Sequence, residues 1–81
     1  MTAIVSRDGI VLAKGEALIE FSARGWSGYF EYPLTTPSLP YGELLMTLDD
    51  GRSAEFVIRQ YVNDGDQDFK KVELRGQEPF K

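Results

Sequence analysis

Apolar residues recur at every second position along most of this chain. That is the period of a β-strand, because successive side chains of a strand point to opposite faces. The segment 16–23 places Ala17, Ile19 and Phe21 on one face, and the segment 26–32 repeats the pattern. No stretch has an apolar stripe at helical spacing. The alternation predicts an all-β protein with strands over 3–6, 10–13, 16–23, 26–32, 43–48, 52–62 and 69–75.

Short glycine-containing turns set how these strands pair. Asp8-Gly9 separates the first two strands, and similar turns stand at 24–25 and 49–51. Asp-Gly is typical of a type I′ hairpin turn, in which both central residues need positive φ. We therefore expect three hairpins, pairing 3–6 with 10–13, 16–23 with 26–32, and 43–48 with 52–62. Strand 69–75 should then pair with the long strand 52–62.

Eighty-one residues suffice for a single domain over 1–81. Hairpins in this number predict a small antiparallel barrel, SH3-like or similar, or a two-layer sandwich of six to seven strands. The eleven-residue strand 52–62 exceeds the usual strand length, so we expect it to bend and serve both layers. The tail from Gly76 to Lys81 is expected to be irregular.

Two local features interrupt the regular pattern. Prolines at 33, 37 and 40 favour a stiff extended crossing between two hairpins, packed on the sheet through Leu34 and Leu39, with Tyr41 beside them. Gly28, inside a strand, indicates a bulge or a place where something packs close to the backbone.

The segments 15–18 and 42–45 resemble each other, as Gly-Glu-Ala-Leu and Gly-Glu-Leu-Leu, and a glycine turn follows each. One interpretation is a duplicated hairpin with pseudo-twofold symmetry. The other is convergence, because every amphipathic hairpin needs alternation and a turn glycine. We favour convergence.

The chain contains neither cysteine nor histidine. These absences remove the Ser-His-Asp and Cys-His nucleophile systems and most zinc sites. The adjacent carboxylates Asp49 and Asp50 fall at a turn tip, where no sheltered pocket would separate their pKa values. We expect a non-enzyme with no catalytic residues and no cofactor.

The loop 63–68 begins like a calcium-binding loop, with Asp64, Asp66 and Asp68 at alternate positions. The match then fails, because Phe69 stands where that motif needs glycine and Arg75 where it needs glutamate. We therefore expect a solvated turn and no metal site.

Charge and hydropathy narrow the range of partners. A net charge of -4 makes nucleic acid an unfavoured partner. The longest apolar stretch, Ile10–Ala13, is far shorter than the roughly 20 residues of a membrane helix. The first residues also lack the pattern of a secretory signal. We expect a cytoplasmic protein that makes no contact with membranes, unless the chain is a fragment of a longer one.

The aromatic side chains divide between the two faces of the predicted strands. Core packing is expected for those on inward positions, which are Phe21, Trp26, Phe30, Tyr32 and Phe56. An outer set consists of Leu18, Tyr29, Leu45, Val57 and Tyr61, with Arg59 in the same strand as two of them. Several apolar side chains on one outer face indicate an interaction surface.

This outer set predicts a non-catalytic protein-interaction or assembly module, with self-association as one form of it. The alternative is a barrel that binds single-stranded nucleic acid or carbohydrate, using Tyr29 and Tyr61 for stacking.

Overall fold

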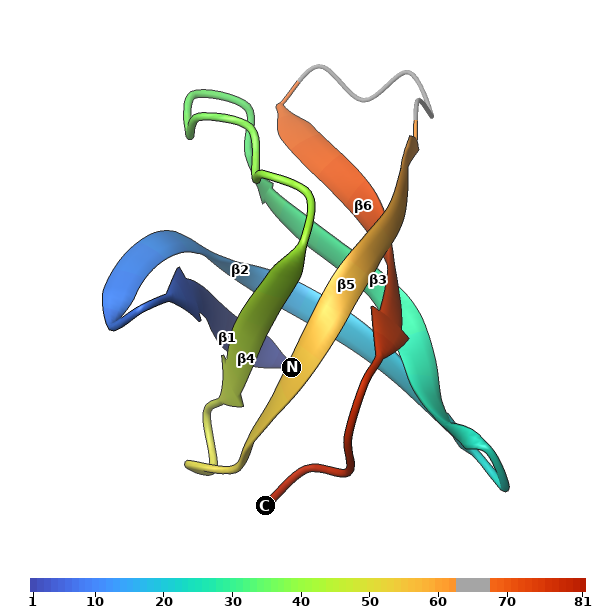
Figure 1. The fold of residues 1–81 in the computed structure, drawn as a ribbon. Coiled ribbons are helices and arrows are strands. Elements are labelled where there is room, and N and C mark those ends of the chain that lie inside the picture. The colour runs from blue at the N-terminus through green and yellow to red at the C-terminus, as the bar shows by residue number, and fades with distance from the viewer. Residues whose placement is uncertain (63–67) are drawn as a thin grey trace.

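Six antiparallel strands close into a barrel in the computed structural model, which describes residues 1–62 and 68–81 (Figure 1). The strands are β1 Thr2–Arg7, β2 Ile10–Ser22, β3 Gly25–Pro33, β4 Glu43–Leu48, β5 Ser53–Val62 and β6 Phe69–Gly76. Their order around the barrel is β1-β2-β3-β6-β5-β4, and β4 returns to pair with β1. The all-β prediction is confirmed, and of its two architectures the barrel is the one formed.

The three predicted hairpins are present. Asp8 and Gly9 have φ values of 53° and 81°, as a type I′ turn requires. β6 pairs with β5 as expected, and its other edge pairs with β3. This second pairing joins the hairpins into one continuous sheet.

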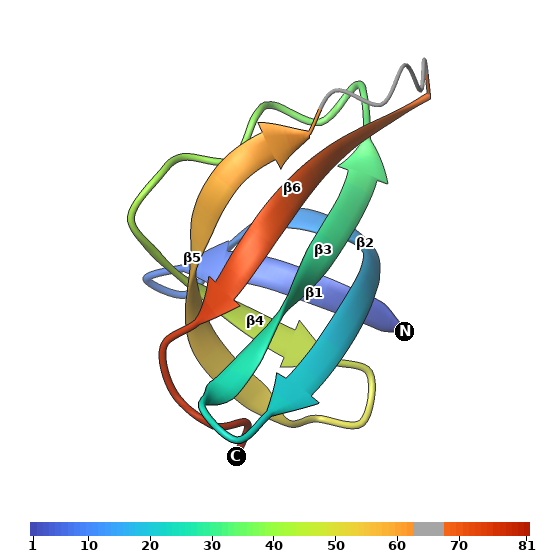
Figure 2. The same cartoon turned by 90° about the vertical axis from the view of Figure 1, so that its right-hand side faces the viewer.

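β2 corrects the sequence prediction, which divided it into strands 10–13 and 16–23. It is a single strand of 13 residues. Residues 10–16 pair with β1 and residues 16–22 pair with β3, on the opposite edge. Gly15 lies where the pairing changes sides, and a Cβ atom there would lie 1.9 Å from the carbonyl oxygen of Glu31. The absence of a side chain at Gly15 lets the strand continue past β3. Figure 2 shows β2 as one unbroken strand alongside β3.

The alternating apolar positions of the strands form the barrel core, to which β2 contributes Ala13 and Ala17. Its largest fully buried side chains are Val5, Phe30, Tyr32, Leu44, Met46, Phe56, Val72 and Leu74. No polar or charged residue among those described is buried. Trp26 joins the core as predicted, whereas Phe21, which stands opposite Trp26 in the β2–β3 ladder, is exposed.

The proline-containing crossing segment closes one end of the barrel through Leu39, which is only 2% exposed. The Leu39 N–H donates to the hydroxyl of Tyr32 at 3.1 Å, and the Leu39 carbonyl accepts a hydrogen bond from the hydroxyl of Tyr61. Leu34 is exposed, so the packing expected for it is wrong. Tyr41 is also exposed and its ring meets that of Tyr61 edge-on.

The C-terminal tail covers the other end of the barrel. The backbone groups of Ser53 and Lys81 exchange hydrogen bonds at 3.1 and 2.9 Å. The indole N–H of Trp26 donates to the carbonyl of Glu78 at 2.8 Å, and the ring of Phe80 packs 4.5 Å from that of Trp26. The tail has no regular secondary structure, as predicted, but it is held in place.

The two similar segments do not play equivalent parts. Gly15 lies inside β2, whereas Gly42 precedes β4 with a φ of 102°. Gly15 is required by the close approach of the Glu31 carbonyl, and Gly42 by its positive φ. These different requirements favour convergence over duplication.

We predict that Gly28→Ala destabilises the fold by about 1–3 kcal/mol, the usual cost of overpacking. An alanine Cβ would lie 1.9 Å from the carbonyl oxygen of Leu18, and a backbone atom cannot swing away as a side chain can. Urea unfolding of both variants measures this, with the exposed neighbour Ser27→Ala as the control, expected within about 0.5 kcal/mol of the parent. Equal stability of the two variants would contradict the close approach.

Candidate functional site

Leu18, Tyr29 and Arg59, three of the six predicted site residues, gather on the outer face of β2, β3, β6 and β5. Leu18 stands directly opposite Tyr29 across the β2–β3 ladder. The Tyr29 hydroxyl donates to Glu73 Oε2 at 3.4 Å, and Arg59 Nε lies 3.7 Å from Glu73 Oε1. Leu18, Tyr29, Arg59 and Glu73 are among the residues that line a hollow of about 190 Å³.

Polar neighbours cover much of Tyr29. Lys71 Nζ lies 5.0 Å from the centre of the Tyr29 ring, a cation–π contact. Leu18 has no such cover and is 66% exposed. The exposed apolar area at this point therefore centres on Leu18 rather than on the tyrosine.

Leu45 and Val57 lie apart from this group. Leu45 is on β4, opposite Ser6 and Glu55, and Val57 is on β5, opposite Glu43 and Arg75. Both side chains are half-buried. The prediction that they share one patch with Leu18 is not met.

Tyr61 does not share the outer face with Tyr29. The register of β5 shifts between Ile58 and Gln60, so Tyr61 stands opposite Val72, a core residue. Directly opposed residues of a ladder point to the same face. The bulge at Arg59 therefore turns Tyr61 toward the mouth of the barrel, where it contacts Leu39 and Tyr41.

The second half of β2 has an edge that the sequence did not reveal. The ladder with β1 ends where Met1 and Ala17 exchange backbone hydrogen bonds at 2.8 and 3.2 Å. Successive residues of a strand direct their N–H and C=O groups to alternate sides. Ala17 directs its groups toward β1, so Ile19 and Phe21 direct theirs to the same side, beyond the start of β1. Within the described part of the chain, no backbone hydrogen bond reaches them from that side.

Apolar side chains line this open edge of β2. Phe21 is 65% exposed, and Met1 and Leu18 are exposed as well. They border a hollow of about 240 Å³ whose other walls are Ala17, Ile19, Leu48 and Arg52. Phe21 also meets Phe80 of the tail edge-on, with ring centres 6.3 Å apart.

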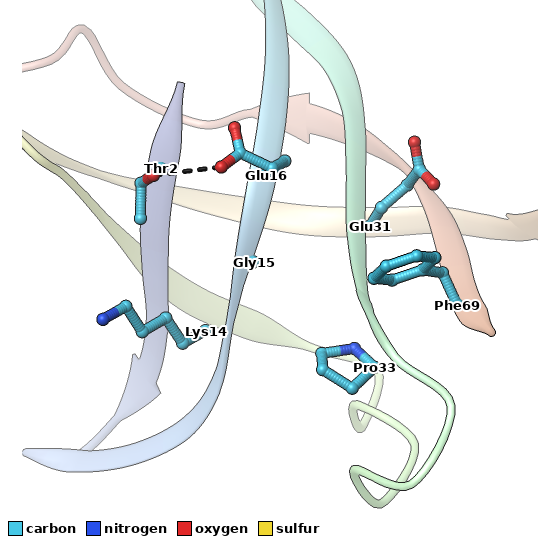
Figure 3. Close-up of a pocket in the computed structure, with 7 residues that line it drawn as sticks. All are labelled: Thr2, Lys14, Gly15, Glu16, Glu31, Pro33 and Phe69. Atoms are coloured by element: carbon cyan, nitrogen blue, oxygen red, sulfur yellow. Dashed lines mark hydrogen bonds between the residues drawn. The ribbon is translucent and has the colours of Figure 1, made fainter.

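A larger hollow of about 350 Å³ lies beside the first half of β2 (Figure 3). Phe69 and Pro33 stand together on one side of it and Thr2 and Lys14 on the other, with Gly15 between them. β3 ends here at Pro33, which has no N–H to offer to the backbone of Lys14. β2 therefore has a second open half-edge, on the side opposite to the first.

The described residues hold no group of three or more histidine, cysteine, aspartate or glutamate side chains that could bind a metal. Of the loop aspartates, Asp68 is described and exposed, and Asp64 and Asp66 lie outside the described residues. Within the same residues there is no helix with the length and apolar character that a membrane crossing requires.

Comparisons of this chain with protein-family models, with curated proteins and with solved structures find no match.

We predict a pH-dependent contribution of Tyr61 to stability. Burial of the hydroxyl, with smaller effects from Tyr32 and Tyr41, raises the pKa of Tyr61 to about 12, above its ordinary value of 10.0. The unfolded chain then loses this proton at lower pH than the folded one. The contribution is thus complete below pH 10 and disappears as the pH rises toward 12.

The measurement is the free energy of unfolding of the parent and of Tyr61→Phe between pH 8 and pH 12. The parent should be more stable at pH 8, by about 1 kcal/mol for the lost hydrogen bond, and this advantage should shrink above pH 10. An advantage that stays constant over the range would contradict the raised pKa of Tyr61.

Proposed function

We propose that this protein is a non-catalytic protein-interaction module that binds an extended polypeptide segment along the open edge of β2. The observation that carries the proposal is the pair of residues Ile19 and Phe21, whose backbone groups on this side have no backbone hydrogen-bond partner among the described residues. The neighbouring side chains of Leu18 and Phe21 are exposed and apolar. Two residues in alternate positions offer two donors and two acceptors at the spacing of an antiparallel partner. Addition of a strand to a sheet edge satisfies all four groups.

The side chains at this edge also favour a protein partner. Leu18 and Phe21 point to opposite faces of β2, so a bound strand could contact an apolar side chain on each of its own faces. The 240 Å³ hollow beside Phe21 leaves room for a side chain of that strand.

The other half-edge of β2 is a poorer site, because it carries the features that commonly protect sheet edges. Lys14 is exposed there, the adjoining β1–β2 ladder is bulged between Val5 and Ser6, and Pro33 ends the neighbouring strand. The segment from Leu18 to Phe21 contains no lysine, proline or bulge.

The alternative function, binding of single-stranded nucleic acid or carbohydrate, receives less support. The two tyrosines on which it depended lie apart, and Lys71 and Glu73 contact Tyr29. The net charge of -4 on the chain also disfavours phosphate binding. The cytoplasmic location expected from the sequence is part of this proposal, and fractionation of cells that express the chain would test it.

Selection of binders from a displayed random-peptide library tests the proposed function. We predict that selected peptides shift the NMR signals of the Ile19 and Phe21 amides and slow their hydrogen exchange. The double variant Leu18→Ser/Phe21→Ser should bind these peptides at least tenfold more weakly, because it keeps the backbone edge and loses its apolar flanks.

The matched control is Ile10→Ser/Val11→Ser, which removes two apolar side chains with nearly the same exposure, 65% and 62%, from the other half of β2. This control should bind as the parent does. The proposal fails if the selected peptides contact another surface, or if both double variants lose affinity equally.

A further inference from the structure

We propose that the strand bound at the open edge of β2 carries a lysine or arginine opposite Glu20, with apolar residues on both sides of it. This specifies the partner of the same edge and rests on the proposed function. The partner is a segment of another protein rather than a second copy of this chain.

Glu20 is the single charged residue between the two residues that would pair with the added strand. It is exposed on the outer face of β2, the face that also carries Leu18. Among the described residues Glu20 takes part in no ion pair, and Arg59, which lines the same hollow, is engaged by Glu73. Its carboxylate is thus available to a partner.

The edge geometry brings the partner residue close to this carboxylate. With Ile19 and Phe21 as the hydrogen-bonded positions, Glu20 occupies a non-hydrogen-bonded position of the new ladder. Opposed Cα atoms are about 4.5 Å apart at such positions, closer than at hydrogen-bonded ones. Opposite charges there stabilise a ladder and like charges destabilise it.

This rule disfavours a second copy of the chain. The twofold register that pairs Ile19 with Phe21 of the second copy places the two Glu20 side chains directly opposite each other. A register that pairs Ile19 with Ile19 of the second copy would pair Phe21 with Ala17, whose backbone groups already bind Met1. A register that pairs Phe21 with Phe21 of the second copy would pair Ile19 with Ala23. Because Ala23 lies in the turn after β2, only the Phe21 pair would be hydrogen-bonded.

The remaining positions define the rest of the partner segment. Residues opposite Ile19 and Phe21 would lie on the face with the apolar hollow, and the residue opposite Leu18 would cover that side chain. Read in the antiparallel direction, the segment has the order apolar, cationic, apolar, apolar. The net charge of -4 on the chain adds a general attraction for such a segment.

The test uses the folded full chain, labelled with ¹⁵N, and a blocked peptide of sequence Gly-Ser-Val-Lys-Val-Leu-Ser-Gly. A second peptide carries glutamate in place of the lysine. Both are titrated to millimolar concentration, and the shifts of the Ile19 and Phe21 amides report binding at the edge. We expect the lysine peptide to bind about five- to tenfold more tightly, the difference between an attractive and a repulsive pair at one exposed position.

Three variants assign this preference to Glu20. Glu20→Gln should make the two peptides bind equally, and Glu20→Lys should invert the preference. Glu55→Gln removes one exposed carboxylate from β5 and should leave the preference unchanged, because the net charge alone does not set it.

Two results would overturn the inference while leaving strand addition intact. One is that both peptides bind the parent with equal affinity. The same conclusion follows if neither of them binds while display-selected peptides still shift the amide signals of Ile19 and Phe21. The other is a dimer of the free chain in sedimentation equilibrium, with slowed exchange at these two amides. If no peptide of any kind shifts them, both the inference and the proposed function are wrong.

Discussion

The structure depends on one constraint, which is that β2 pairs with two different strands on opposite edges. A barrel of six strands and 81 residues closes only because this long strand passes from β1 to β3 within its own length. The change of partner occurs at Gly15, where the backbone of β3 approaches too closely for any side chain. Each half of β2 is therefore paired on one edge and open on the other. The candidate site is a direct consequence of the way in which the barrel closes.

The two ends of the barrel are closed by segments that are not strands. Leu39 closes one end, held by the hydroxyl groups of Tyr32 and Tyr61, and Phe80 closes the other against Trp26. A chain this short buries a smaller share of its surface than a larger domain does. The crossing segment with Leu39 and the C-terminal tail with Phe80 extend the apolar core beyond what the strands alone enclose. The tail also brings Phe80 next to Phe21 of the candidate site.

Much of the fold could be predicted from the sequence because alternation and turn glycines are local signals. Asp8-Gly9 specified its turn type, and the inward positions of β3, β4 and β6 are the buried ones. The errors in the predicted strands and faces arose where tertiary structure overrides the two-residue alternation of apolar positions. β2 was predicted as two strands, because the close approach of the Glu31 carbonyl to Gly15 joins residues 16 apart in the sequence and leaves no local signal. Tyr61 was placed on the wrong face because the bulge at Arg59 is visible only in the pairing with β6.

The candidate site was only partly predictable for the same reason. Leu18 could be recognised as an outward apolar residue from β2 alone. The open edge beside it follows from the registers in which β1 and β3 pair with β2, which no local pattern encodes. Amide hydrogen exchange of the free protein tests this account most directly. Ile19 and Phe21 should exchange nearly as fast as in an unfolded chain, whereas Leu18 and Glu20, which face β3, should be protected. Equal protection of all four amides would show that this edge is already occupied and would contradict the account.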